Sequence, residues 1–441
     1  MHDTLLPPGA ALDAVFDVGL ITRVEGEGSL HLHVADGKVT HARLEIFEAP
    51  RYFEQLVIGR TPDETIDIVA RICGICPIAY QMSAVHAFED LFGVEVAPET
   101  RILRRLLYCG EWIESHALHV YLLHAPDFLG YPSAVELAAD HRAVVEQGLA
   151  LKKTGNDIVR LLGGRPIHPI SVRVGGFSRA PRRADVAALR PALEAAVAQS
   201  EATVHFVAGL DVPVYEREPR LVALKHPTEY PFNHGRIVSS DGLDLPIGGW
   251  ETAFDEQHVP WSHALQARTL EGGRYLLGPA ARVSLCAEQL HPRAAALLAE
   301  TGLADLIRRN PYWSIAARAI ELVHATAEAL DIAEGYRPPD RPMEPWTARA
   351  GTAAWSSEAP RGLLFHRYEI DERGLIAAAR IVPPTSQNQA AIEDDLAQFA
   401  PSVLALSHAD ATHKLEQLIR SYDPCISCAT HFLDLRLERE P

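Results

Sequence analysis

Apolar and polar residues alternate near the beginning of the chain, through residues 18–34 and again through residues 39–47. An alternation with a period of two is typical of a strand that buries one face. Between the two runs stands Ala35-Asp36-Gly37-Lys38, a short polar sequence with the glycine that tight turns favour. The pattern therefore predicts a β-hairpin in this part of the chain.

Most of the remaining chain has the periodicity of helices. Thr61 followed by Pro62 is a typical helix start. The patterns in residues 213–275 and 368–381 predict short strands joined by loops instead. Helical spacing of apolar residues marks the longest segments, which are 98–125, 134–162, 185–208, 280–330 with a break at Pro311, and a last stretch up to residue 420. These patterns predict an α+β protein that is mostly α, with long helices at its core and β-structure at its periphery.

Length and composition indicate one large unit. The 441 residues contain no Gly/Ser-rich linker and no internal repeat, so we expect a single domain over residues 1–441. The net charge of −17 argues against nucleic-acid binding, which needs a basic face. No uncharged apolar run of about 18 residues is present, so no membrane span is expected. Since no signal peptide is visible and six cysteines are too few for a disulfide framework, we expect a cytoplasmic protein.

Four of the six cysteines form two Cys-x-x-Cys pairs near opposite ends of the chain, Cys73 with Cys76 and Cys425 with Cys428. Two thiolates at this spacing bind one metal ion together, and soft sulfur ligands favour zinc, iron, nickel or copper(I). A structural zinc site and redox-active dithiols are alternatives. The pairs of a structural zinc site are usually separated by about 15–20 residues, whereas most of the chain separates these two. The separation favours a buried transition-metal site in a large core.

The residues around both pairs resemble a known family. Arg71-Ile72-Cys73-Gly74-Ile75-Cys76 and Asp423-Pro424-Cys425-Ile426-Ser427-Cys428-Ala429-Thr430-His431 are similar to the two cysteine motifs of the large, catalytic subunit of nickel-iron hydrogenases. The resemblance implies the fold of that subunit. It also implies that the four cysteines hold nickel, and that Cys76 and Cys428 bridge to an iron with carbon monoxide and cyanide ligands. Cys425 would be the base that takes the proton when dihydrogen is split.

Three further matches to the family carry over functional residues. Thr22-Arg23-Val24-Glu25-Gly26 matches a motif whose glutamate passes protons from a nickel-bound cysteine, which implies this role for Glu25. A carboxylate suits it because it takes and gives a proton over a short hydrogen bond. Glu358-Ala359-Pro360-Arg361-Gly362 matches the segment whose arginine projects over the open side of the metals. Asp127 matches an aspartate near the active site that holds an arginine. Taken alone, Glu25 and Arg361 would be ordinary surface residues.

The same resemblance implies ligand groups beside the nickel-iron centre. Pro384 and Thr385 match a turn whose polar groups bond a cyanide ligand of the iron. Glu54 precedes Cys73 by nineteen residues, the spacing that the family uses for a carboxylate on a magnesium or iron ion, and His431 matches a ligand of that second metal. A carboxylate, a histidine and several waters suit such a hard cation. Taken alone, Glu54 is an ordinary helix-face glutamate.

The activity that the resemblance implies is the reversible conversion of dihydrogen to protons and electrons. Because this chain has no spare cysteines for an iron-sulfur cluster, an iron-sulfur small subunit is required as a partner. Flavin subunits that use NAD(P), together with maturation proteins, are expected as well. Tyr80 departs from a histidine common in the family, and its surroundings resemble the cytoplasmic members linked to NAD(P). The alternatives are a hydrogen-sensing regulator and a non-catalytic homologue. Residues 432–441 extend past the point where most members are processed, which is typical of a precursor or of an unprocessed member.

Overall fold

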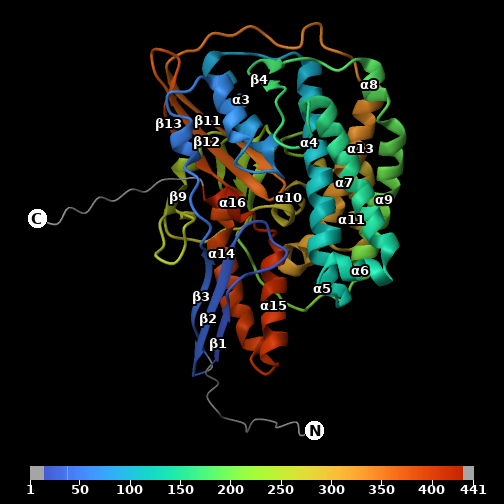
Figure 1. Cartoon of the computed structure of the whole chain (residues 1–441), viewed down its shortest axis with the longest axis vertical. Coiled ribbons are helices and arrows are strands. Elements are labelled where there is room, and N and C mark those ends of the chain that lie inside the picture. Colours follow the sequence, from blue (N-terminus) through green and yellow to red (C-terminus); the bar gives the residue numbers. More distant parts are fainter. Residues whose placement is uncertain (1–13, 37, 431–441) are drawn as a thin grey trace, which may run out of the picture.

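The computed structural model describes residues 14–36 and 38–430, in which long helices form one side of the molecule and small sheets the other (Figure 1). α13 lies against both α4 and α9, α7 lies against α4, and most residues of α13 are buried. The predicted fold, mostly α with a long-helix core, is confirmed. The four long helices are α4 (Pro98–Ala117), α7 (Arg142–Gly163), α9 (Arg190–Ala208) and α13 (Ser314–Gly335).

Two glycines allow α4 and α7 to pack closely. A Cβ on Gly155 of α7 would stand 2.5 Å from the carbonyl oxygen of Gly110 in α4. A Cβ on Gly110 would likewise stand 2.9 Å from Ile158. Any larger residue would therefore push the two helices apart, because close-packed interiors do not absorb an added methyl group without strain. This close crossing brings α4 into the centre of the molecule, beside the helix that follows the first cysteine pair.

Small antiparallel sheets lie at the periphery, as predicted (Figure 1). Two of the three-stranded sheets bear on the site, because loops at their ends reach the interior. The strands are β1 (Ala14–Val18), β2 (Gly28–Ala35), β3 (Lys38–Ile46), β4 (Val172–Arg173), β5 (Gly176–Phe177), β6 (Val222–Lys225), β7 (Arg236–Ser239), β8 (Asp244–Pro246), β9 (Phe254–Gln257), β10 (Gln266–Thr269), β11 (Gly351–Ala359), β12 (Gly362–Ile370) and β13 (Ile376–Val382).

The predicted hairpin is confirmed as β2 and β3, but the prediction of one continuous strand over residues 18–34 is wrong. The chain leaves the sheet after Val18 and rejoins it at Gly28. In between, Glu25 pairs with Cys425 in an isolated bridge, where its carbonyl oxygen accepts the N–H of Ile426 at 2.9 Å. Backbone contact with the far end of the chain thus replaces the local ladder that the alternation predicted.

The predicted helix start at Thr61 is confirmed. α2 (Pro62–Val69) begins with a capping box, in which the Thr61 hydroxyl accepts from the Glu64 N–H while the Glu64 carboxylate accepts from the Thr61 N–H. The chain then turns through residues 70–76, and α3 (Pro77–Phe92) begins directly after the first cysteine pair. α3 is buried along nearly its whole length, against α2, β11 and β12. The first pair therefore lies in a turn fixed between two packed helices.

Helices also occupy the other predicted segments, but His141 divides the segment 134–162 into two helices, and Pro311 opens a short 3-10 turn before α13. A π-helix (Leu118–His124) continues α4 and leads into the short α5. Within the described residues, no helix has the length and apolar character that a membrane crossing requires. The other helices are α1 (Phe53–Leu56), α5 (Ala125–Leu129), α6 (Ala134–Asp140), α8 (Arg183–Ala187), α10 (Pro279–Cys286), α11 (Pro292–Thr301), α12 (Ala304–Arg309), α14 (Pro384–Phe399), α15 (His408–Ser421) and α16 (Ile426–Ala429).

Candidate metal centre

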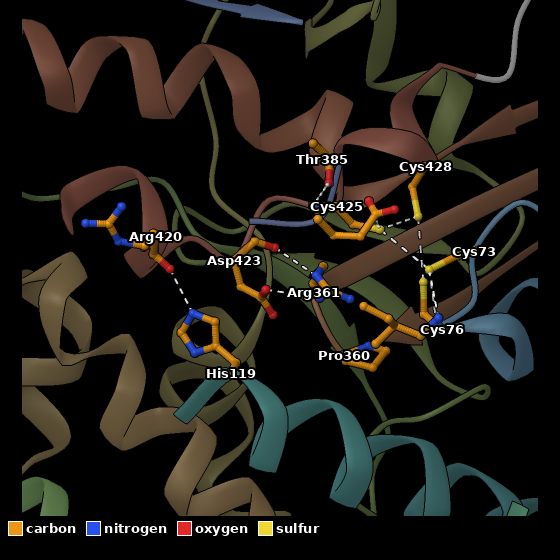
Figure 2. A network of polar contacts seen from close by, with 12 residues as sticks. Cys73, Cys76, His119, Pro360, Arg361, Thr385, Arg420, Asp423, Cys425 and Cys428 are labelled. Atoms are coloured by element: carbon orange, nitrogen blue, oxygen red, sulfur yellow. Dashed lines mark hydrogen bonds and ion pairs between the residues drawn. The ribbon is translucent and has the colours of Figure 1, made fainter. Parts of the chain in front are cut away.

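The two cysteine pairs meet in the interior, although 352 residues separate Cys73 from Cys425 (Figure 2). All four Sγ atoms lie within 4.8 Å of one another, and all four residues are buried free thiols. The distance from Cys73 Sγ to Cys425 Sγ is 3.5 Å, and that from Cys76 Sγ to Cys428 Sγ is 3.7 Å. A tetrahedral metal ion with metal–sulfur bonds of about 2.3 Å sets its ligand atoms about 3.8 Å apart. These two distances fit ligands of one cation, while Cys425 Sγ and Cys428 Sγ stand closer together, at 2.8 Å.

Backbone N–H groups position the sulfur of the first pair. The Sγ of Cys73 accepts from the N–H of Ile75 at 3.3 Å and from that of Cys76 at 3.2 Å. Burial disfavours a thiolate at Cys73, but hydrogen bonds from the other cysteines, Cys425 first, lower its pKa. On the second pair, the N–H of Cys425 donates to the Thr385 hydroxyl at 3.0 Å. Hydrogen bonds within the protein itself thus hold both cysteine loops in place.

Glu25 reaches the cysteine cluster from the loop between β1 and β2. Its Oε2 lies 3.1 Å from Cys425 Sγ, which donates to it, and also accepts from the N–H of Ser427 at 3.1 Å. Gly26 permits this approach, because its φ is 88° and a Cβ there would stand 2.6–2.9 Å from three neighbouring atoms. The structure therefore brings together a buried thiol and a carboxylate that can exchange a proton.

Arg361 occupies the tip of the β11–β12 hairpin and lies between Asp423 and the cysteine cluster (Figure 2). Its Nε donates to the Asp423 carbonyl at 2.8 Å, and its Nη2 donates to Asp423 Oδ1 at 3.0 Å. Burial disfavours the charged guanidinium, but Asp423 and the cysteine thiolates raise the pKa of Arg361. Among the described residues, the buried Nη1 has no hydrogen-bond partner. The Arg361 guanidinium therefore places a permanent positive charge beside the sulfurs, and its Nη1 group remains available to donate hydrogen bonds.

Asp127 holds two arginines, and neither of them is Arg361. Its carboxylate accepts from Arg420 at 2.8 and 2.9 Å, and it also accepts from Arg23. Burial opposes ionisation of Asp127, but the hydrogen bonds and charge of Arg420 lower its pKa. Arg23 precedes Glu25 by two residues, and Arg420 lies shortly before the second cysteine pair. Asp127 thereby ties the Glu25 loop to the C-terminal segment.

The other predicted ligand residues lie around the same region. Pro384 and Thr385 form the first turn of α14, next to the second cysteine pair. Glu54 lies in α1, and its Oε1 accepts from the N–H of Ile381 at 2.7 Å. His431 lies outside the described residues. The structure thus shows Glu54 close to the end of β13, while the pairing of Glu54 with His431 stays a prediction.

Two buried titratable residues, Glu111 and Tyr80, lie beside the first pair, and Glu111 was not predicted. Glu111 of α4 accepts from the N–H groups of Ile78 at 2.6 Å and Ala79 at 3.2 Å, so it caps the first turn of α3. Burial raises the pKa of Glu111 well above its usual value. Tyr80 is fully buried, and burial together with the nearby Cys428 raises its pKa. No pattern in the sequence distinguishes Glu111 from the charged residues on an exposed helix face.

Two further site residues were missed. Asp423 is part of the second motif, and the structure gives it the task of holding Arg361. Its φ of 52° is uncommon for a residue other than glycine. Arg51 links the two cysteine loops, because its guanidinium donates to the carbonyl of Ile72 at 2.7 Å and to the carbonyl of Ser427. The motif could have pointed to Asp423, whereas nothing in the local sequence marks Arg51.

Four buried thiols from both ends of one chain, with a carboxylate and an arginine against them, define a metalloprotein with an enclosed sulfur-ligated centre. The family model described as nickel-dependent hydrogenase matches residues 51–148 and 306–431, which include all four cysteines of the centre. The chain belongs to this family, so the predicted family and enzyme class are confirmed.

Similar proteins match nearly the whole chain. The alpha subunit of sulfhydrogenase 2 from Pyrococcus furiosus is 33% identical over 432 residues, covering 96% of this chain and 100% of that protein. The beta subunit of the NAD-reducing hydrogenase HoxS from Cupriavidus necator is 27% identical and covers 94% of both chains. Among solved structures, an NAD+-reducing nickel-iron hydrogenase in its dihydrogen-reduced state superimposes with a TM-score of 0.85 at 27% identity, covering 95% of this chain and 99% of that one.

Proposed function

We propose that this chain is the catalytic subunit for the reversible oxidation of dihydrogen to protons and electrons. In this proposal Cys73, Cys76, Cys425 and Cys428 would hold nickel, and Cys76 and Cys428 would also be ligands of an iron that carries carbon monoxide and cyanide. One observation supports it most strongly: Cys425 Sγ, a member of the four-sulfur cluster, already donates to the Glu25 carboxylate at 3.1 Å. A structural zinc site would not need such a proton acceptor.

The residues present fit a nickel-iron centre. Soft thiolates suit nickel and iron, and the cluster offers four of them in a buried space from which bulk water is excluded. Arg361 adds a positive charge that offsets the charge of four thiolates. When bound, the centre supplies the redox chemistry and the Lewis acidity that polarise dihydrogen. The protein supplies the base, the proton relay and the fixed charge around it.

Proton handling falls to Cys425 and Glu25. The Cys425 thiolate takes up the proton that leaves dihydrogen, and the short contact to Glu25 Oε2 passes it on. The Ser427 N–H donates to the same oxygen and keeps the carboxylate aimed at the sulfur. The Glu25 loop is in turn fixed by Arg23, which Asp127 holds. Asp127 therefore acts by positioning this loop, in line with its expected task of holding an arginine.

Arg361 and the first turn of α14 are proposed to bind the ligands of the iron. The Arg361 N–H₂ group without a described partner stands beside the cluster and can donate to a cyanide. Thr385 accepts from Cys425 N–H and retains its own hydroxyl proton for donation. We further propose that Glu54 and His431 bind a magnesium or iron ion, with the carboxylate of Glu54 as a hard ligand.

Electrons must leave the centre through a partner, because the remaining two cysteines, Cys109 and Cys286, lie buried outside the cluster. Gly74, which lies between Cys73 and Cys76, is exposed. A Cβ added to Gly74 would stand 3.8 Å from the side chain of Ile167, which is also exposed. This thin cover over Cys73 suits the approach of an iron-sulfur small subunit. The NAD-reducing relatives favour flavin and NAD(P) subunits beyond it, and maturation proteins would build the centre.

Infrared spectroscopy of the purified complex, combined with metal analysis, tests the proposal. One nickel per copy of this chain, together with iron and with absorption bands of metal-bound carbon monoxide and cyanide, is the expected result. Dihydrogen-dependent reduction of a dye then distinguishes an enzyme from a hydrogen-sensing or non-catalytic homologue. Zinc in place of nickel, at one per chain and without these infrared bands, would overturn the proposal. The Cys425→Ser variant, purified in the same way, is the matched control for the bands.

A further inference from the structure

The position of Arg361 depends on a two-residue hairpin turn. β11 ends at Ala359 and β12 begins at Gly362, and these two residues are paired, so Pro360 and Arg361 alone form the tip. A tip of this kind can rock about its strands unless other elements hold it. The Arg361 side chain is fixed at its far end by Asp423, and a second device holds the backbone at its near end.

That device is Arg282 of α10, whose five N–H groups are all used. Its Nε and Nη2 donate to the two carboxylate oxygens of Glu321 at 2.7 and 2.8 Å. Its Nη1 donates to Glu358 Oε2 at 2.9 Å and to the carbonyl of Ala359 at 3.0 Å, and Nη2 donates to the carbonyl of Pro360 at 2.8 Å. The two carbonyls belong to the residues directly before Arg361. Arg282 therefore grips the hairpin tip by its backbone.

The cluster of Arg282, Glu321 and Glu358, called the clamp below, is completely buried. All three side chains have an exposed fraction of 0%. Glu321 comes from α13, and Glu358 also accepts from the N–H of Leu224 at 2.7 Å, so the clamp joins the helical core to two sheets. The Arg282 guanidinium lies over the Trp112 ring, 4.2 Å from its centroid. Apolar residues of similar volume often stabilise a core as well as a buried ion pair does, which points to a positional task for this one.

The backbone beside the tip confirms how closely α10 approaches it. Gly278, the residue before α10, has a φ of 102°, and a Cβ there would stand 2.8 Å from the Arg361 carbonyl oxygen. Gly362 has a φ of 133°, and its Cβ would stand 2.5 Å from Leu277. Side chains at either position would push the tip away from α10. The tip of the hairpin is therefore fitted to the start of α10 on one side and gripped by Arg282 on the other.

We infer that the clamp of Arg282, Glu321 and Glu358 is a positioning device, which sets the Arg361 guanidinium over the metal centre by holding the carbonyls of residues 359 and 360. The inference rests on the proposed function, because it assigns a task in turnover to Arg361. The hydrogen bonds described for the Arg282 guanidinium do not reach the cysteines. We therefore expect Arg282 to affect catalysis only through Arg361.

A double-mutant cycle in the complete complex tests this inference. Arg282→Lys keeps the positive charge but cannot make five planar hydrogen bonds, so the grip on the two carbonyls is lost. Because misplacement of a reacting group by about 1 Å can cost about 100-fold in rate, we expect kcat to fall about 10- to 100-fold with KM for dihydrogen unchanged. The cyanide bands should shift, since the donors of Arg361 move. In the Arg361→Lys background, Arg282→Lys should add no further loss, because residues that act as one unit are not additive.

Arg104→Lys is the matched control. Arg104 is as deeply buried, donates two hydrogen bonds to Glu89 and a third to the carbonyl of Arg173, and none of these bonds involves the hairpin tip. It should change stability without shifting the cyanide bands. If losses from Arg282→Lys and Arg361→Lys multiply, or if Arg282→Lys leaves the bands and kcat as in wild type, the inference is wrong. Wild-type complex without cyanide bands or turnover would instead refute the proposed function, so the two failures are distinguishable.

Glu358→Gln provides a second route should Arg282→Lys yield no folded protein. Glutamine has the shape of Glu358 and one remaining carbonyl oxygen, so it weakens the clamp without opening a cavity. For Glu358→Gln we expect a smaller fall in kcat than for Arg282→Lys, and a shift of the cyanide bands in the same direction. Both effects should vanish in the Arg361→Lys background. A fall of equal size in both backgrounds would contradict a path through Arg361.

Discussion

Replacing Glu25 by glutamine tests whether this carboxylate carries protons away from Cys425. Glu25 Oε2 lies 3.1 Å from Cys425 Sγ and 3.1 Å from the backbone nitrogen of Ser427. Glutamine has the same length, and its amide oxygen can still accept the Ser427 N–H, so the loop and the metal centre should persist. An amide does not take up a proton near neutral pH. Only the proton relay is therefore removed.

The expected loss follows from what a positioned acid–base group contributes, which is about 10²–10⁴-fold in rate. We expect kcat of dihydrogen-dependent dye reduction in Glu25→Gln to fall by about that factor. Glu25→Asp withdraws the carboxylate by about 1.5 Å, which takes it beyond hydrogen-bonding distance of the sulfur. This variant should therefore lose most of the rate although it keeps the acid. Exchange of dihydrogen with deuterated water should slow in both variants.

Metal content and the infrared bands of each variant show whether the centre is intact. Glu27→Gln is the control, because Glu27 is an exposed carboxylate two residues further along the same loop, and it should keep the wild-type rate. A Glu25→Gln variant with intact bands and a wild-type rate would refute the relay. A rate that falls only in proportion to lost nickel would also refute it, because Glu25 would then serve assembly alone.

Three further predictions concern the surroundings of the centre. Gly26→Ala should abolish nickel loading, measured by metal analysis, because its φ is 88° and the added Cβ would stand within 3 Å of three atoms. Thr385→Val leaves the buried Cys425 N–H without its acceptor, so it should cost about 1–3 kcal/mol in thermal unfolding, while Thr385→Ser should not. Burial opposes the charge of Glu89, but Arg104 lowers its pKa from 4.5 to about 2, so the pair stabilises the fold above pH 4.5 and loses this effect as pH falls toward 2. Glu89→Gln should therefore be about 3 kcal/mol less stable at pH 7, a difference that must shrink in unfolding curves over that acid range.

The sequence by itself determined the local elements and the four cysteines that gather in the interior. The capping box at Thr61 and the apolar periodicity of the long helices act over a few residues, so they can be predicted without the fold. The two cysteine motifs likewise identified the sulfurs that meet. Prediction failed at residues 19–27, because their partner is the second cysteine pair at the far end of the chain.

Only the tertiary structure decided which charged groups meet. Asp423 holds Arg361, and Asp127 holds Arg420, although nothing in the spacing of these residues distinguishes one pairing from the other. Arg282 shows the same limit, because its sequence neighbours on α10 give no sign that its guanidinium reaches the hairpin tip. Hydrogen bonds and ion pairs act over a few ångströms in space, so the residues that make them are known only once the chain has brought them together.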